Sequence, residues 1–105
     1  MKPTKEAPVE ATVIVNRLGT VEDVDDAACA LLGYSREELL GLHGSDLIPA
    51  DAQPATAVAI DRMLLGEIPL QRHGRVRRKD GSVLGVDVRT QILPNERLAF
   101  SLRKR

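Results

Sequence analysis

The feature that most constrains this chain is the alternation of apolar and polar residues in its last third. Between residues 82 and 92, apolar or small side chains take every second position: Leu84, Val86, Val88, Thr90 and Ile92. The positions between them include charged and amide side chains. A period of two predicts a strand with one buried and one solvated face. Residues 97–103 alternate in the same way and predict a second such strand.

Turn residues join the predicted strands into hairpins. An Asp-Gly pair separates residues 70–78 from residues 82–92, and this pair favours a tight hairpin turn. A β-branched run at residues 12–16 and a short run at residues 21–24 predict another hairpin near the start of the chain. Hairpins at both ends of a helical middle predict one antiparallel sheet with helices across one face, a fold of the α+β class.

Three helices are expected between the two hairpins. The Asp pair at 25–26 can cap a short helix that ends at Gly33. Ser35, with Glu38 three residues later, forms a capping box that begins a second short helix. Residues 51–66 carry the longest helical pattern, with a broad apolar stripe.

Composition excludes several classes of protein. Aromatic residues make up 2% of the chain, so the core must be aliphatic, and the composition counts against an aromatic platform for RNA. The single Cys29 excludes an internal disulfide and a cysteine-based zinc site. Residues 1–11 form a polar, flexible lead-in, and the longest aliphatic run, residues 27–32, is too short to cross a bilayer. We expect one cytoplasmic domain over residues 12–105, without membrane contact.

The formal net charge is +0, yet the charges are separated along the chain. Up to Gln53 there are four basic and ten acidic residues, and from Pro54 onward there are eleven basic and five acidic residues. The separation has two interpretations. The charges can simply keep two surfaces solvated, or an acidic and a basic face can meet in a homo-oligomer or with a partner.

Part of the basic half is predicted to form an interaction surface. Alternation places one set of arginines on the outer face of adjacent strands: Arg75, Arg77, Arg89 and Arg97. Such a face either stays solvated or docks on an acidic surface, which includes the acidic half of a second copy. The neutral overall charge and the lack of a groove-reading motif argue against nucleic acid.

Three motifs resemble those of the PAS family of sensory domains. They are GYSREELLG at residues 33–41, LIPAD at residues 47–51 and RVRRKDGS at residues 75–82. Their order and spacing are similar to those of the family over residues 12–103. The resemblance implies a five-stranded antiparallel sheet with helices packed on its inner face. One departure is Asp25, which stands where many members have Asn before the first short helix.

The resemblance also implies a function. PAS domains dimerise and relay signals, as in two-component systems, to an output domain or protein, and we expect this chain to act through such contacts as a homodimer. The length leaves no room for an output domain, so the partner is expected in trans or in a longer chain. The alternative is a sensor that holds a small apolar ligand between sheet and helices. Its candidate pocket residues are Val58, Met63, Val86, Val88, Leu98 and Phe100.

Cofactor chemistry and catalysis are not expected. Haem-binding members use a His that is commonly on the long helix, but residues 51–66 contain none, and His43 and His73 lie elsewhere. The reactive-cysteine motif of flavin-binding members is missing, and Cys29 is expected to behave as a small hydrophobe. The acidic cluster at residues 22–26 matches no calcium loop. No catalytic triad, phosphate loop or metal-ligand spacing indicates an enzyme.

Overall fold

The structure, a computed structural model, describes residues 10–49, 62, 64–66 and 71–105. The strands are β1 (Ala11–Val15), β2 (Val21–Val24), β3 (Gln71–Arg77), β4 (Val83–Leu93) and β5 (Arg97–Lys104). The helices are α1 (Asp26–Leu32) and α2 (Arg36–Leu39), with the short 3-10 helices η2 (Gly44–Leu47) and η4 (Pro94–Glu96). Strands therefore stand at both ends of a helical segment, as the turn pattern predicts.

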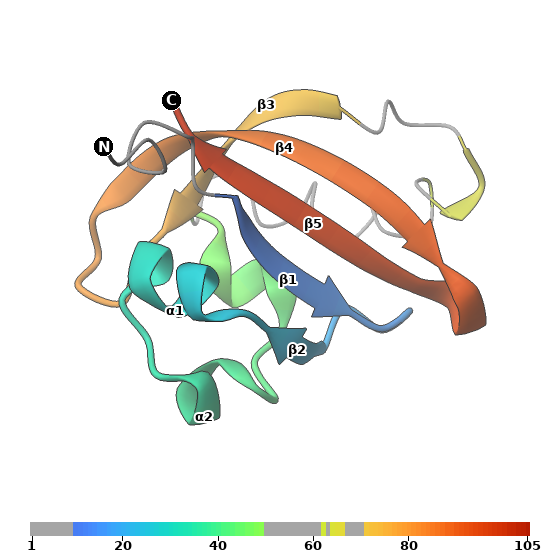
Figure 1. The fold of residues 1–105 in the computed structure, drawn as a ribbon, viewed down its shortest axis with the longest axis horizontal. Coiled ribbons are helices and arrows are strands. Elements are labelled where there is room, and N and C mark those ends of the chain that lie inside the picture. Colours follow the sequence, from blue (N-terminus) through green and yellow to red (C-terminus); the bar gives the residue numbers. More distant parts are fainter. Residues whose placement is uncertain (1–9, 50–61, 63, 67–70) are drawn as a thin grey trace, which may run out of the picture.

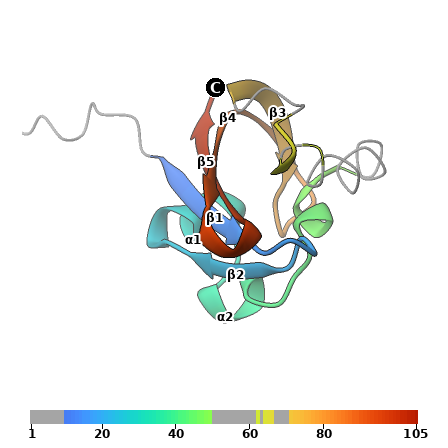
Figure 2. The ribbon, with the colours of Figure 1, turned by 90° about the vertical axis from the view of Figure 1, so that its right-hand side faces the viewer.

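The five strands form one antiparallel sheet in the order β2-β1-β5-β4-β3 (Figure 1). β1 pairs with β5, so the first and the last strand lie side by side at the centre of the sheet. α1 packs on β1, α2 packs on β2, and η2 packs on β3. Figure 2 shows α1 and α2 close to β1 and β2 in a second view. The predicted α+β fold with a five-stranded antiparallel sheet is confirmed.

Most element boundaries differ from the sequence prediction by one residue. The first strand begins at Ala11 rather than residue 12, and β4 runs over Val83–Leu93 rather than residues 82–92. The predicted long helix over residues 51–66 lies largely outside the described residues. Of that segment, Arg62 and Leu64 are described as helical. Most of the predicted lead-in also lies outside the described part.

The helix caps follow the prediction. The Asp25 carboxylate accepts a hydrogen bond from the Ala28 N–H at 2.8 Å and thereby caps α1. The same oxygen accepts from the Thr12 N–H of β1 at 3.1 Å. Gly33 ends α1 with φ of 80°, a left-handed conformation that favours glycine. The capping box of Ser35 and Glu38 is formed in both directions. Asp25 therefore caps a helix and also joins it to the sheet.

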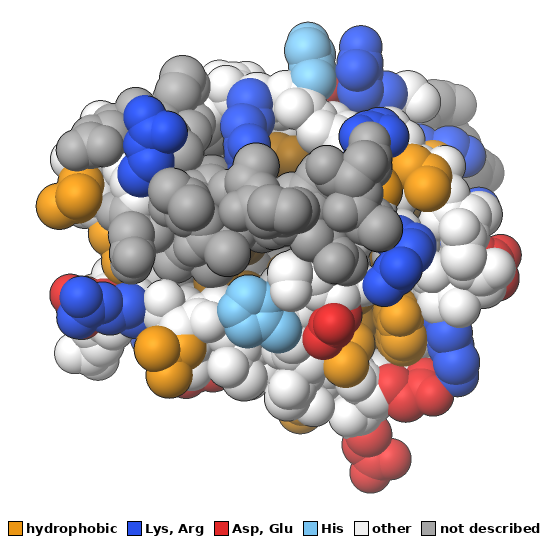
Figure 3. Space-filling view, turned by 180° about the vertical axis from the view of Figure 1, so that it is seen from behind, with side chains coloured by type: hydrophobic (Ala, Val, Ile, Leu, Met, Phe, Trp, Pro, Cys, Tyr) orange, Lys and Arg blue, Asp and Glu red, His pale blue; other side chains and the backbone are white. Residues whose placement is uncertain are grey.

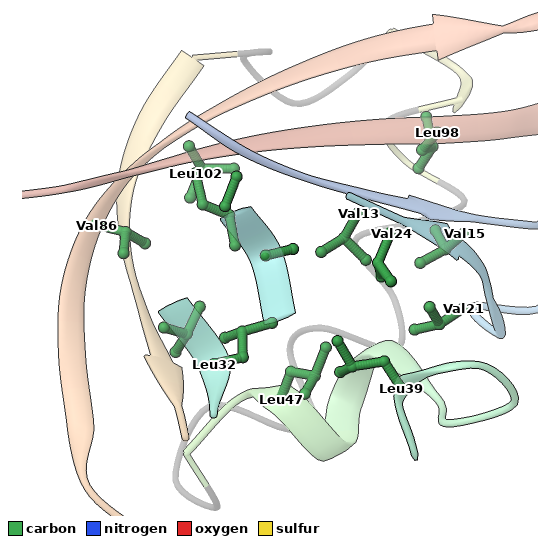
Figure 4. Packing of buried hydrophobic residues seen from close by; sticks show 14 residues of the cluster. Val13, Val15, Val21, Val24, Leu32, Leu39, Leu47, Val86, Leu98 and Leu102 are labelled. Atoms are coloured by element: carbon green, nitrogen blue, oxygen red, sulfur yellow. The ribbon is translucent and has the colours of Figure 1, made fainter. Parts of the chain in front are cut away.

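The core lies between the sheet and the helices and is aliphatic, as Figure 4 shows. We call this side of the sheet the inner face and the opposite side the outer face. The largest fully buried side chains are Leu32, Leu39, Leu98, Val15, Val21 and Val86. The two aromatic residues, Tyr34 and Phe100, are only partly buried against this cluster. The sheet is thus held to its helices by leucine and valine packing.

Ile92 lies on the inner face, as the alternation predicts, but its side chain is not buried. Ile92 pairs with Leu98, which is fully buried, yet Ile92 is 45% exposed. It lies one residue from the end of β4, next to the β4–β5 turn. The described helices α1 and α2 pack mainly on β1 and β2 rather than on β4. Alternation gives the face of a residue but not whether another element covers it.

We predict that Asp25→Ala lowers the free energy of unfolding by about 1–2 kcal/mol, because the variant removes the carboxylate that accepts from the Thr12 and Ala28 N–H groups. Urea unfolding monitored by circular dichroism measures the change. Asp26→Ala is the matched control, since Asp26 is exposed and its carboxylate makes no hydrogen bond with the described residues. Equal losses in the two variants would contradict the assignment.

Candidate interaction and ligand-binding surfaces

β4 presents two different surfaces from neighbouring residues. The strand register places Arg89 opposite Gln71 on one side and Ser101 on the other. These residues lie on the outer face, where Arg89 is exposed. The next residue, Thr90, is paired with Phe100 and is only 3% exposed on the inner face. The pleat of one strand therefore supplies both an outer and an inner candidate site.

The outer face carries a groove of about 320 Å³ that crosses β3, β4 and β5. We call it the Arg89 groove. Its lining residues are Glu10, Gln71, Arg72, His73, Asp87, Val88, Arg89, Ser101 and Arg103. All but Val88 are polar or charged, so this groove fits polar groups rather than a purely apolar molecule.

Most charges around the Arg89 groove already have partners. The His73 Nδ1 atom lies 2.6 Å from the Asp87 carboxylate, and the Arg105 Nε atom lies 3.7 Å from the same oxygen. Arg103 is 3.4 Å from the Glu10 carboxylate. The side chains of Arg72 and Arg89, in contrast, make no ion pair or hydrogen bond with the described residues. Arg89 lies between Gln71 and Ser101 in register, next to the row that contains Asp87, so its guanidinium is an available cation in the groove.

The four arginines of the predicted interaction surface have different surroundings. Arg75 is exposed on β3 opposite Gly85. Arg77 is half-buried and donates to the Asp46 carbonyl oxygen at 3.2 Å. Arg97 lies 4.0 Å from the Glu22 carboxylate. Arg77 and Arg97 therefore contact other parts of their own chain, whereas Arg89 faces the groove.

Folding brings the acidic and basic halves of the chain together. Lys79 lies 2.5 Å from the Glu38 carboxylate, and Arg17 lies 3.4 Å from Glu96. Each pair joins one residue before Gln53 to one after it. On the face drawn in Figure 3, Lys and Arg side chains are spread around the molecule with acidic side chains among them. On this face the separation along the sequence therefore does not become a basic patch.

The acidic cluster at residues 22–26 has structural partners. Arg36 donates to the Asp23 carboxylate at 2.7 Å and also to the Val24 carbonyl oxygen. This hydrogen bond from Arg36, with a backbone hydrogen bond from Val24, holds the pKa of Asp23 below its usual value. Hydrogen bonds from Lys79 and then from Ser35 lower the pKa of Glu38. Among the described residues, no group of three His, Cys, Asp or Glu side chains could hold a metal ion.

The two histidines differ in role. The His43 Nδ1 atom accepts from the Ser45 N–H at 3.0 Å and caps η2. Its Nε2 atom lies 2.8 Å from the Leu18 carbonyl oxygen, which can only accept, so Nε2 carries the proton. His73 is exposed and contacts Asp87. Cys29 is half-buried beside the core. His43 thus links the β1–β2 turn to the segment that follows α2.

The inner face holds four of the six predicted pocket residues. The other two, Val58 and Met63, lie outside the described residues. Val86 and Leu98 are fully buried core residues, Val88 is buried, and Phe100 is partly buried. Leu98 pairs with a residue six positions along β4 from Val86, about 20 Å away. The four residues thus share the inner face, with Val86 and Leu98 far apart on it.

Sequence reasoning missed the importance of Thr90. Its Oγ1 atom is buried and has no hydrogen-bond partner among the described residues. Buried polar groups in native proteins are almost always hydrogen-bonded, so such an orphan needs an explanation. The sequence does show one hydroxyl side chain among the aliphatic residues that point inward from β4. The structure adds that this hydroxyl makes no hydrogen bond with the described residues.

A family model described as PAS fold matches residues 21–99. The chain belongs to the PAS family. No curated protein sequence matches the chain. The resemblance of the three sequence motifs is confirmed, and as a PAS domain the chain is a sensory signalling module.

Solved structures agree with this membership. A domain of a sensory box sensor histidine kinase/response regulator from Geobacter sulfurreducens is 26% identical, with a TM-score of 0.79 over 90% of this chain and 82% of that one. A PAS domain from Desulfitobacterium hafniense is 22% identical, with a TM-score of 0.77 and 98% coverage of both chains. The RpfR quorum-sensing receptor PAS domain from Cronobacter turicensis, in complex with C12:0, is 12% identical, with a TM-score of 0.78 over 90% of this chain and 92% of that one.

None of the described helices is both long enough and apolar enough to span a membrane.

We predict that the Asp23–Arg36 pair contributes to the acid sensitivity of this PAS domain. The pKa of Asp23 in the folded protein lies below its usual value of 3.8. The ionised carboxylate therefore stabilises the fold above pH 3.8, and this stability is lost as the pH falls through the pKa of Asp23 in the folded protein. Asp23→Asn should lower the free energy of unfolding at pH 6 by less than about 1 kcal/mol, because the pair is exposed. The difference from wild type should shrink at pH 3.

Urea unfolding at the two pH values measures this effect. Glu37→Gln is the control, because Glu37 is exposed on α2 and makes no ion pair with the described residues. A loss in Asp23→Asn that is as large at pH 3 as at pH 6 would show that the carboxylate charge is not responsible.

Proposed function

We propose that this PAS domain relays its signal through contacts made by the outer face of the sheet, and that one such contact joins two copies of the chain. The observation that supports the proposal is the unpaired Arg89 in a groove whose other charges are largely paired. A guanidinium offers two parallel donors to a carboxylate, which makes it suited to a specific protein contact. Aliphatic side chains do not supply such directionality.

The carboxylate that meets Arg89 comes from the partner copy. Asp26 and Glu37 are exposed on α1 and α2 and make no ion pair with the described residues. Glu22, Asp23 and Glu38, in contrast, are close to cations of their own chain. Charge complementarity between an unpaired cation and unpaired acids favours contact between copies.

The wider role follows from family membership. The similar domain from Geobacter sulfurreducens is part of a sensor histidine kinase/response regulator. The present domain would likewise act on an output partner, in the same chain or in another. It would do so in the cytoplasm and without catalysing a reaction itself. A two-component system is the setting that this likeness favours.

A second candidate function is the sensing of a small molecule on the inner face. Two observations favour it. The buried hydroxyl of Thr90 has no partner among the described residues, and a PAS domain of the same fold binds C12:0. The two functions are compatible, because one uses the outer face and the other uses the inner face of the same sheet.

We predict that Arg89→Ala weakens self-association by about tenfold, because the substitution removes the charge that the partner's carboxylate meets. Sedimentation velocity over a concentration series at low salt measures the dimer constant, and the effect should shrink at high salt. Arg17→Ala is the matched control. Arg17 is also an exposed arginine, but it pairs with Glu96 away from the groove.

Two results would contradict the proposal. One is a wild-type chain that stays monomeric at the highest concentration and lowest salt. The other is an equal loss of association in the Arg89 and Arg17 variants, because a general charge effect would then suffice.

A further inference from the structure

The inner face contains a polar atom that the protein does not satisfy by itself. The Thr90 side chain is 3% exposed, and its Oγ1 atom has no hydrogen-bond partner among the described residues. Transfer of a hydroxyl from water into an apolar site is unfavourable unless a hydrogen bond replaces the lost one. A group that hydrogen-bonds to this hydroxyl would therefore stabilise the folded protein.

The neighbours of Thr90 are apolar. Its partner on the neighbouring strand β5 is Phe100. On β4 itself, the residues two positions away on the same face are Val88 and Ile92. Phe100 is only partly buried and Ile92 is 45% exposed, although both lie on the inner face. Four residues before Thr90 on the same face of β4, Val86 is fully buried. Along β4 the inner face therefore passes from the buried core at Val86 and Val88, through Thr90, to the partly exposed Ile92.

We propose that Thr90 is the polar anchor of a ligand site, and that the ligand is a mainly aliphatic molecule with one neutral hydrogen-bonding group. This inference rests on the second function proposed above and specifies its ligand class. Val88, Phe100 and Ile92 contact the aliphatic part, and the Thr90 hydroxyl meets a hydroxyl or carbonyl group. A hydroxyl can both donate and accept, so either group is suitable.

The same surroundings disfavour a charged head group. One neutral hydroxyl cannot replace the hydration of an ion, and the residues that flank Thr90 on this face carry no charge. The arginine next to it, Arg89, points to the outer face. An alcohol or a ketone should therefore bind better than the carboxylate of the same chain length.

The test uses 1-hexanol, hexanoate and hexane as probes of the whole chain. Binding is followed by NMR titration of ¹⁵N-labelled protein, and thermal unfolding is followed without probe. Thr90→Val removes the hydroxyl and keeps the shape, whereas Thr90→Ser keeps the hydroxyl. We expect Thr90→Val to weaken hexanol binding about threefold to tenfold and to leave hexane binding unchanged. Thr90→Ser should retain the preference for hexanol over hexane.

A second readout separates a ligand anchor from a structural residue. If the hydroxyl is unsatisfied in the free protein, Thr90→Val should raise the melting temperature by about 4–8 °C. A lower melting temperature would show that the hydroxyl already has a partner, such as a bound water molecule, and would overturn the proposal. Equal hexanol affinity in wild type and Thr90→Val, or no hexanol binding at millimolar concentration, would overturn it as well.

Self-association of the same samples is measured by sedimentation velocity. The contact between copies does not depend on this inner-face site, so a failure at Thr90 leaves dimerisation intact. Loss of dimerisation with intact probe binding would instead count against the outer-face function. The two failures are therefore distinguishable.

Discussion

The pairing of β1 with β5 at the centre of the sheet is the contact on which the rest of the fold depends. It joins Ala11 to Leu102 and Val15 to Leu98, residues that lie more than eighty positions apart in the chain. Without it, the first hairpin and the last three strands would be separate, and each would be too small to bury a core. With it, α1 and α2 are held under the same sheet that carries the β3–β5 surface.

Specific contacts attach the helices α1 and α2 to the sheet. Asp25 caps α1 and also accepts a hydrogen bond from β1. Farther along, the Lys79 N–H in the β3–β4 turn donates to the last carbonyl oxygen of α1 at 3.0 Å, and the Lys79 ammonium group contacts α2 through Glu38. The two hairpins thus contact the same pair of helices. A change in one hairpin has a direct physical route to the other through these helices.

Sequence reasoning succeeds here wherever the deciding interaction is local. The alternation in β4, the cap at Asp25 and the capping box at Ser35 depend on residues a few positions apart. It fails where distant elements decide. The exposure of Ile92 depends on which helix covers that end of the sheet. The contact of Arg77 with η2 joins residues 31 positions apart, and no local pattern encodes it.

The two candidate sites differ in the same way. The inward position of Thr90 follows from alternation, but its lack of a partner is a property of the packed structure. The outward position of Arg89 is likewise local, whereas its freedom depends on Asp87 and Glu10 having other partners. Charge separation along the chain was therefore a poor guide to the folded surface. Part of it disappears in contacts within one molecule, whereas the side chain of Arg89 has no partner among the described residues.

The most direct test of the central claim, contact between copies through the outer face, is solvent paramagnetic relaxation in NMR. Side-chain signals are recorded with a neutral gadolinium chelate at low and at high protein concentration. The account predicts that Arg89 and Ser101 become protected at high concentration, while Asn95 in the β4–β5 turn stays accessible. Unchanged accessibility of Arg89 and Ser101 in a sample that has dimerised would place the contact elsewhere and contradict the account.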